Sequence, residues 1–195
     1  MMTILLGWLG MILYVGIAVF YVGLMKRGEF ALIHILFALT FVMWIPLPLT
    51  LYRTEASEIL LVGTLFGCFY MIMMIIAMTL QAGHLAYIDK NTGIDVKYAN
   101  HLMTILSNPF EAMANVMKSI WAFCLGMAFW TNGLKWLALL LFLISLFGVY
   151  YLLLVLKASL KKEGTFVDRI KANVYWTNAE TLLLFGCLLC YLTLQ

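Results

Sequence analysis

Six long apolar stretches, separated by polar connections, occupy most of the chain. They lie at about residues 3–25, 30–52, 59–83, 112–130, 134–156 and 174–194. Each is close to the roughly 20 mostly apolar residues that a helix needs to cross the hydrocarbon core of a bilayer. The pattern predicts an all-α fold: a polytopic membrane protein whose six transmembrane helices form one bundle, in a single domain over residues 1–195.

Lysine and arginine are divided unequally between the two sides that six spans create. Ten fall on the side of the first, third and fifth connections, whereas only Arg53 and Lys135 fall on the other. Because cytoplasmic loops of membrane proteins carry the excess of Lys and Arg, we expect those three connections in the cytoplasm. Both termini are then outside, and the plasma (inner) membrane is the expected location.

Composition agrees with this class of protein. Only 11% of the residues are charged, whereas a soluble domain carries about a quarter. No basic run interleaved with aromatic residues lies outside the spans, so we expect no nucleic acid partner. The expected partners are the lipid bilayer and other membrane protein subunits.

Three ionisable residues fall inside or at the edge of spans: His34, His84 and Glu180, with Gln81 and Asn178 close to two of them. Ionisable groups at membrane depth are costly and therefore mark candidate sites. All five lie on the predicted cytoplasmic half, where they could form one polar pocket. In the alternative interpretation, the histidines lie at the headgroup interface and Glu180 is hydrogen-bonded to a neighbouring helix.

Cofactor and metal binding stay open. His34 and His84, from different helices at similar depth, could ligate haem, or a metal with Glu180 as third ligand. Neither histidine belongs to a motif with ligand spacing. We expect the cysteines to be structural, because all of them fall within apolar spans: Cys68, Cys124, Cys187 and Cys190.

Polar residues also continue into the fourth span. Glu111, Asn115 and Lys118 are spaced i, i+4 and i+7 and share one helix face. We expect this face to be solvated where the helix emerges into the cytoplasm. It could instead line the pocket.

Helix starts are predicted at two places before spans. Residues 108–111, Asn-Pro-Phe-Glu, have a capping residue, a first-turn proline and an acidic third residue. Residues 165–168 carry a similar signal and could start the helix of the sixth span. Residues 96–106 have one apolar face and could form a separate helix on the membrane surface.

Pro46 and Pro48 interrupt the second span near its outer end. Each proline lacks a backbone N–H and disfavours helix in the residue before it. We expect the helix to end here in an extended exit, although a broken helix can also form a substrate site.

Glycines at helical spacing predict close helix contacts in two spans, since they let backbones approach. They are Gly16 and Gly23 in the first span and Gly63 and Gly67 in the third. Packing inside the bundle is favoured over packing against a second copy.

Catalytic signatures are absent from the sequence: it contains no Walker A, HExxH or GxSxG motif. This favours a non-catalytic integral membrane subunit or scaffold of a larger membrane complex. A second interpretation is a small transporter or channel that uses the pocket of His34, His84 and Glu180. A third is a haem- or metal-binding redox subunit or a membrane enzyme.

Overall fold

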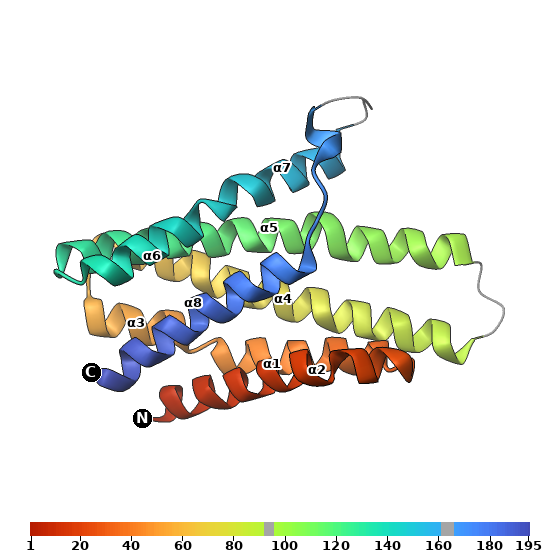
Figure 1. Ribbon diagram of the computed structural model, residues 1–195, viewed down its shortest axis with the longest axis horizontal. Coiled ribbons are helices and arrows are strands. Elements are labelled where there is room, and N and C mark those ends of the chain that lie inside the picture. Colours follow the sequence, from red (N-terminus) through yellow and green to blue (C-terminus); the bar gives the residue numbers. More distant parts are fainter. Residues whose placement is uncertain (92–95, 161–165) are drawn as a thin grey trace.

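The computed structural model describes residues 1–91, 96–160 and 166–195, and all regular secondary structure in these ranges is helical. The helices lie side by side with their long axes in similar directions, and both termini are at the same end (Figure 1). The elements are α1 (Met2–Lys26), α2 (Phe30–Trp44), α3 (Leu47–Glu55), α4 (Glu58–Lys90), α5 (Val96–Thr131), α6 (Lys135–Ser145), α7 (Phe147–Ser159), the 3₁₀ helix η1 (Phe166–Arg169) and α8 (Val174–Leu194).

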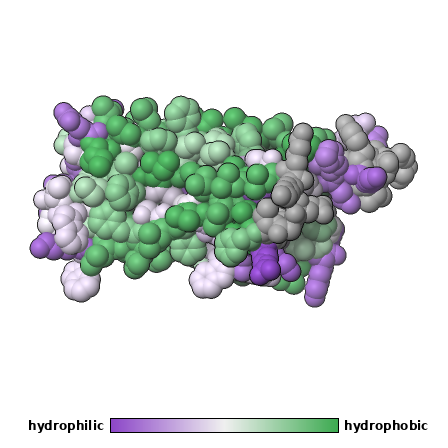
Figure 2. Space-filling model, turned by 90° about the horizontal axis from the view of Figure 1, so that it is seen from above, coloured by the Kyte–Doolittle hydropathy of each residue, from purple (hydrophilic) through white to green (hydrophobic). Residues whose placement is uncertain are grey.

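Six helical stretches of the described chain are long and apolar enough to cross a membrane, with α2–α3 and α6–α7 each counted as one stretch. The all-helical fold is confirmed, and these stretches indicate an integral membrane protein. Apolar residues cover most of the face seen in Figure 2, and hydrophilic residues gather toward its two ends. Large side chains such as Phe20, Leu143 and Leu146 are more than 60% exposed, as expected where a helix faces lipid rather than water.

The two ends of the molecule differ in charge. The C-terminal ends of α1, α4 and α7 lie toward the end opposite the termini (Figure 1). This end, here called the Lys/Arg-rich end, includes Lys26, Lys90, Lys157 and Lys171.

The second span is interrupted at Ile45 and Pro46, but the helix resumes at once as α3. The expected extended exit is therefore wrong. Pro48 occupies the first turn of α3, where backbone N–H groups have no partner within the helix and the missing N–H costs little.

The fourth span begins much earlier than expected. Both the predicted helix start at 108–111 and the separate surface helix at 96–106 are wrong, because α5 is one helix from Val96 to Thr131 with Pro109 inside it. Proline removes a helical hydrogen bond and disturbs the preceding turn. The N–H that Pro109 lacks would bond to the carbonyl of Ile105; the next carbonyl, that of Leu106, accepts a hydrogen bond from Nε2 of Gln81 at 3.3 Å. The helix α5 continues through the proline and packs along α4.

The helix of the sixth span does not start at the signal in residues 165–168. Residue 165 lies outside the described residues, and Phe166–Arg169 forms the short η1. The helix α8 begins separately at Val174, and Oδ1 of Asn173 accepts the backbone N–H groups of Tyr175 and Trp176 at 3.0 and 3.2 Å. This side-chain cap satisfies donors that the first helical turn leaves without partners.

An aromatic core holds α8 against the other helices. The rings of Trp44 and Phe185 stack at 3.9 Å between centroids, and Phe185 also lies against Trp121 and Tyr70. Nε1 of fully buried Trp44 donates to the carbonyl of Gly7 at 3.0 Å, which ties α2 to α1.

The glycines of the two spans differ in their surroundings. A Cβ added at Gly67 would meet Trp121 at 2.8 Å, and one at Gly63 would meet Cys124 at 2.5 Å. These residues bring α4 against α5 within the chain. Around Gly16 and Gly23 an added Cβ meets no described atom within 4 Å, so the expected packing against a helix of this chain is wrong there.

Candidate functional site

A cavity of about 810 Å³ opens between α1, α2, α4, α5, α7 and α8. Its wall runs from exposed His101 and Lys171, at the Lys/Arg-rich end, to buried Tyr70 and Tyr151. A volume of this size is in the range of small-molecule binding sites, about 300–1,000 Å³. The cavity is therefore large enough for a small organic molecule.

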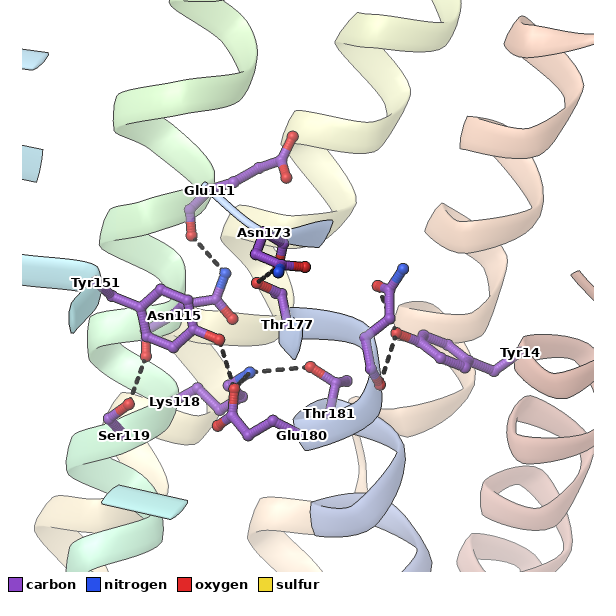
Figure 3. A network of polar contacts seen from close by, with 11 residues as sticks. Tyr14, Glu111, Asn115, Lys118, Ser119, Tyr151, Asn173, Thr177, Glu180 and Thr181 are labelled. Atoms are coloured by element: carbon purple, nitrogen blue, oxygen red, sulfur yellow. Dashed lines mark hydrogen bonds and ion pairs between the residues drawn. The ribbon is translucent and has the colours of Figure 1, made fainter. Parts of the chain in front are cut away.

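A buried ion pair lies beside the inner end of this cavity (Figure 3). Nζ of Lys118, on α5, is 2.9 Å from Oε2 of Glu180, on α8, and their side chains are 0% and 3% exposed. Nζ also donates to Oγ1 of Thr181 at 2.9 Å, and the hydroxyl of Tyr151 donates to Oε2 of Glu180 at 2.5 Å. The rings of Tyr70 and Tyr151 lie 5.6 and 5.3 Å from the ammonium. Thr181, Tyr151 and Tyr70 also line the cavity, so the ion pair is one side chain away from its interior.

This cluster meets the requirements for a buried charge only in part: the ammonium of Lys118 is paired, whereas Oε1 of Glu180 is buried and has no hydrogen-bond partner among the described residues. A buried charge is tolerated when it is paired and its remaining hydrogen-bonding capacity is used. The ammonium has a carboxylate, a hydroxyl and two aromatic faces around it, and each of the helices α5, α7 and α8 contributes. Any motion that separates α8 from α5 must therefore break this arrangement.

The expected solvated face of α5 is wrong, because Asn115 and Lys118 are 3% and 0% exposed. The alternative, that this face lines the pocket, agrees with the wall of the cavity, which includes Glu111 and Asn115. Lys118 was counted with the loop residues in the charge comparison. Nine Lys and Arg remain against two when it is removed, so the charge bias is kept.

A second group of polar side chains forms the wall between α4 and α5. Nε2 of Gln81 donates to Oε1 of Glu111 at 2.5 Å. Nδ2 of Asn115 donates to the backbone carbonyl of Glu111 at 2.8 Å. Since a carbonyl oxygen only accepts, this bond fixes which end of the Asn115 amide is nitrogen. Oδ1 of Asn115 is buried and has no hydrogen-bond partner among the described residues.

The predicted pocket residues divide into two sets. His34, Gln81 and Asn178 line the cavity; Nδ1 of His34 is 2.7 Å from the carbonyl of Phe30, and Oδ1 of Asn178 accepts from the hydroxyl of Tyr14 at 2.9 Å. Glu180 lies behind the cavity wall, bonded to Lys118. His84 is not among the lining residues of the described chain.

The sequence analysis missed Tyr151, Tyr14 and Thr181 as site residues, and for Lys118 it favoured a solvated face over the pocket. A signal existed for Lys118, which is a lysine inside the apolar stretch at 112–130 and is costly there for the same reason as Glu180. The tyrosines and the threonine had no comparable signal, because such residues are common in membrane spans.

The described residues contain no group of three or more His, Cys, Asp and Glu side chains that could hold a metal ion. The metal site with Glu180 as third ligand is therefore not formed, since this carboxylate is bonded to Lys118 instead. No family model, curated protein or solved structure matches this chain.

Proposed function

We propose that this protein is a small membrane transporter that binds a solute in the cavity and moves it across the membrane. The observation that carries the proposal is a cavity of about 810 Å³ whose wall includes Tyr151 and Thr181, the side chains bonded to the buried Lys118–Glu180 ion pair. The Lys/Arg-rich end faces the cytoplasm in this proposal, in keeping with the charge bias of the loops, and both termini are outside.

Energetics favour a transporter over a scaffold. Replacing a buried ion pair by well-packed apolar residues is often neutral or stabilising. A scaffold that only holds other subunits gains nothing from a lysine and a glutamate at this depth, nor from a large cavity, which sacrifices packing contacts. A transporter needs both a space for its solute and contacts that break and re-form between helices.

The ion pair joins α5 to α8 in this conformation and can break when the two helices separate. Lys118 comes from α5, whereas Glu180 and Thr181 come from α8. Two other spans have joints at which helix segments can change direction, at Ile45 and Pro46 between α2 and α3 and at Leu146 between α6 and α7. Broken helices beside a site near the middle of the membrane are a recurring feature of transporters. Breaking the Lys118–Glu180 ion pair would let α5 and α8 separate, so that the cavity opens toward the end of the molecule that carries the termini.

Alternating access supplies a test that needs no knowledge of the solute. Met74 on α4 lines the cavity and is 7% exposed. Met74→Cys is placed in a protein whose native cysteines are replaced, and a membrane-impermeant thiol reagent is added to either side of sealed vesicles. The matched control is Ala122→Cys on α5, which is 0% exposed and not a lining residue. The cysteines to replace are Cys68, Cys124, Cys187 and Cys190.

We expect Met74→Cys to react from both sides, faster from the Lys/Arg-rich end, and Ala122→Cys to react from neither. A carrier alternates between two openings, so the position facing its cavity becomes reachable from each side in turn. Reaction of Met74→Cys from one side alone, over times long enough for complete labelling there, would overturn the proposal and leave a scaffold with a one-sided cavity.

A further inference from the structure

We infer that the ligand of this cavity carries a protonated primary amine, which binds at Asn115 and Glu111. This inference deepens the proposed function and rests on it, because it names the chemical class of the solute. It is drawn from which hydrogen-bonding groups of the cavity are already used and which are not.

Two acceptors on one face of α5 are available to a donor. Asn115 belongs to the cavity wall, and its buried Oδ1 has no partner among the described residues. The carboxylate of Glu111 accepts one hydrogen bond from Gln81 and has lone pairs for further donors. Residues four apart on a helix are neighbours, about 5–6 Å between their Cβ atoms, so one ammonium group with three N–H donors can reach both.

Two donors, one in the cavity wall and one behind it, are in contrast already bonded. Nε2 of Gln81 gives hydrogen bonds to the Leu106 carbonyl and to Glu111. Nζ of Lys118 donates to Glu180 and Thr181. A buried anion needs donors and an unpaired buried acceptor costs free energy, so a cationic donor fits these walls better than an anion does.

Aromatic side chains form much of the remaining cavity wall around the proposed amine site. Six rings line the cavity and provide apolar surface for the body of a ligand and π faces for its charge: Tyr14, Tyr21, Phe37, Phe41, Tyr70 and Tyr151. Lys118 gives a precedent within the molecule. Its primary ammonium is held by a carboxylate and a hydroxyl, with the rings of Tyr70 and Tyr151 at 5.6 and 5.3 Å.

The cations of the cavity wall lie toward its mouth. Nζ of Lys157 donates to the carbonyl of Ile170 at 2.7 Å, and Lys171 is exposed. Charges in contact with water and salt are screened within about 10 Å, whereas Glu111 is half-buried beside buried Asn115. Lys157 and Lys171 therefore repel the ammonium of a ligand less strongly than Glu111 and Asn115 attract it.

Calorimetric binding to the purified full-length protein tests the inference with four probes of similar shape: phenethylamine, its trimethylammonium analogue, 2-phenylethanol and 3-phenylpropanoate. We expect phenethylamine to bind at least about tenfold more tightly than the other three, because only it brings both a positive charge and N–H donors. Equal binding of the trimethylammonium analogue would overturn the assignment of N–H donors, and tighter binding of the alcohol or the acid would overturn the ligand class.

Variants locate the amine. Asn115→Leu and Glu111→Gln should each weaken phenethylamine binding by about tenfold, since each removes a hydrogen bond or charge that contacts the ammonium. The matched control is Thr64→Val, at a buried polar residue of α4 outside the cavity. This variant should bind phenethylamine with the same affinity as the parent protein. Glu111→Gln keeps the shape and an acceptor for Gln81, so it remains informative where Asn115→Leu fails to fold. Unchanged affinity in Glu111→Gln would refute the site.

The two proposals fail in different ways. If phenethylamine does not bind while Met74→Cys reacts from both sides of the membrane, the amine inference is wrong and the transporter proposal stands. If phenethylamine does not bind and Met74→Cys reacts from one side alone, both are wrong.

Discussion

Removing one charge of the Lys118–Glu180 pair should destabilise the protein more than removing both. The two groups are 2.9 Å apart and almost fully buried. At an effective dielectric constant of about 20, two unit charges at this distance attract each other by about 6 kcal/mol. Desolvation offsets most of this attraction, but deletion of one partner leaves the other buried without compensation, at a cost of about 3–5 kcal/mol.

We therefore expect Lys118→Met and Glu180→Gln each to lower the free energy of unfolding by about 3–5 kcal/mol. The double variant contains neither charge, and its glutamine still offers an oxygen to the hydroxyl of Tyr151. It should lose less than either single variant, which gives a coupling free energy of at least about 3 kcal/mol. The assay is unfolding in mixed detergent micelles, followed by tryptophan fluorescence, for the parent, both single variants and the double variant.

A control cycle pairs Lys118→Met with Thr64→Val. Thr64 is buried and bonded to the carbonyls of Leu60 and Pro48, away from the ion pair. The losses in this cycle should add to within about 0.5 kcal/mol. Two results would refute the reasoning that these buried charges compensate each other. One is that the losses of unfolding free energy for Lys118→Met and Glu180→Gln simply add in the double variant. The other is that the Lys118→Met variant is as stable as the parent protein.

Two further predictions concern packing and topology. Gly67→Ile should lower the melting temperature, because a Cβ there would meet Trp121 at 2.8 Å. Gly16→Ile should leave it unchanged, because a Cβ there meets no described atom within 4 Å. Equal melting temperatures for the two variants would contradict the helix packing. Cysteine labelling in sealed vesicles should find Ser159→Cys reachable only from the cytoplasmic side and Ala56→Cys only from the other, and labelling of both from one side would contradict six spans.

The positions of the spans could be predicted because hydropathy is a local property. Each span needs its own run of apolar residues, whatever its neighbours are, and the predicted stretch at 174–194 lies within one residue of each end of α8. Boundaries were less well predicted where tertiary contacts override local signals. Residues 108–111 carry a helix start signal, yet α5 runs through them, packed along α4.

The site could be predicted only in part. Glu180, Gln81 and Asn178 were singled out because polar groups at membrane depth are costly, and this cost is visible in one sequence. Their partners were not, since a sequence does not give the rotation of each helix about its axis. Lys118, 62 positions from Glu180, was therefore assigned to a solvated face.

The sequence by itself thus determined that the chain forms helices apolar enough to cross a membrane, where those helices lie in the chain, and which end of the molecule carries most Lys and Arg residues. These properties follow from the transfer of each residue between water and lipid, which depends little on its distant neighbours. Only the tertiary structure decided that Lys118 meets Glu180, that the buried Oδ1 of Asn115 has no partner among the described residues, and that Gly67 rather than Gly16 lies against another helix. Those outcomes depend on how the helices are rotated and packed against one another, because side chains on one helix face are brought together only by that packing.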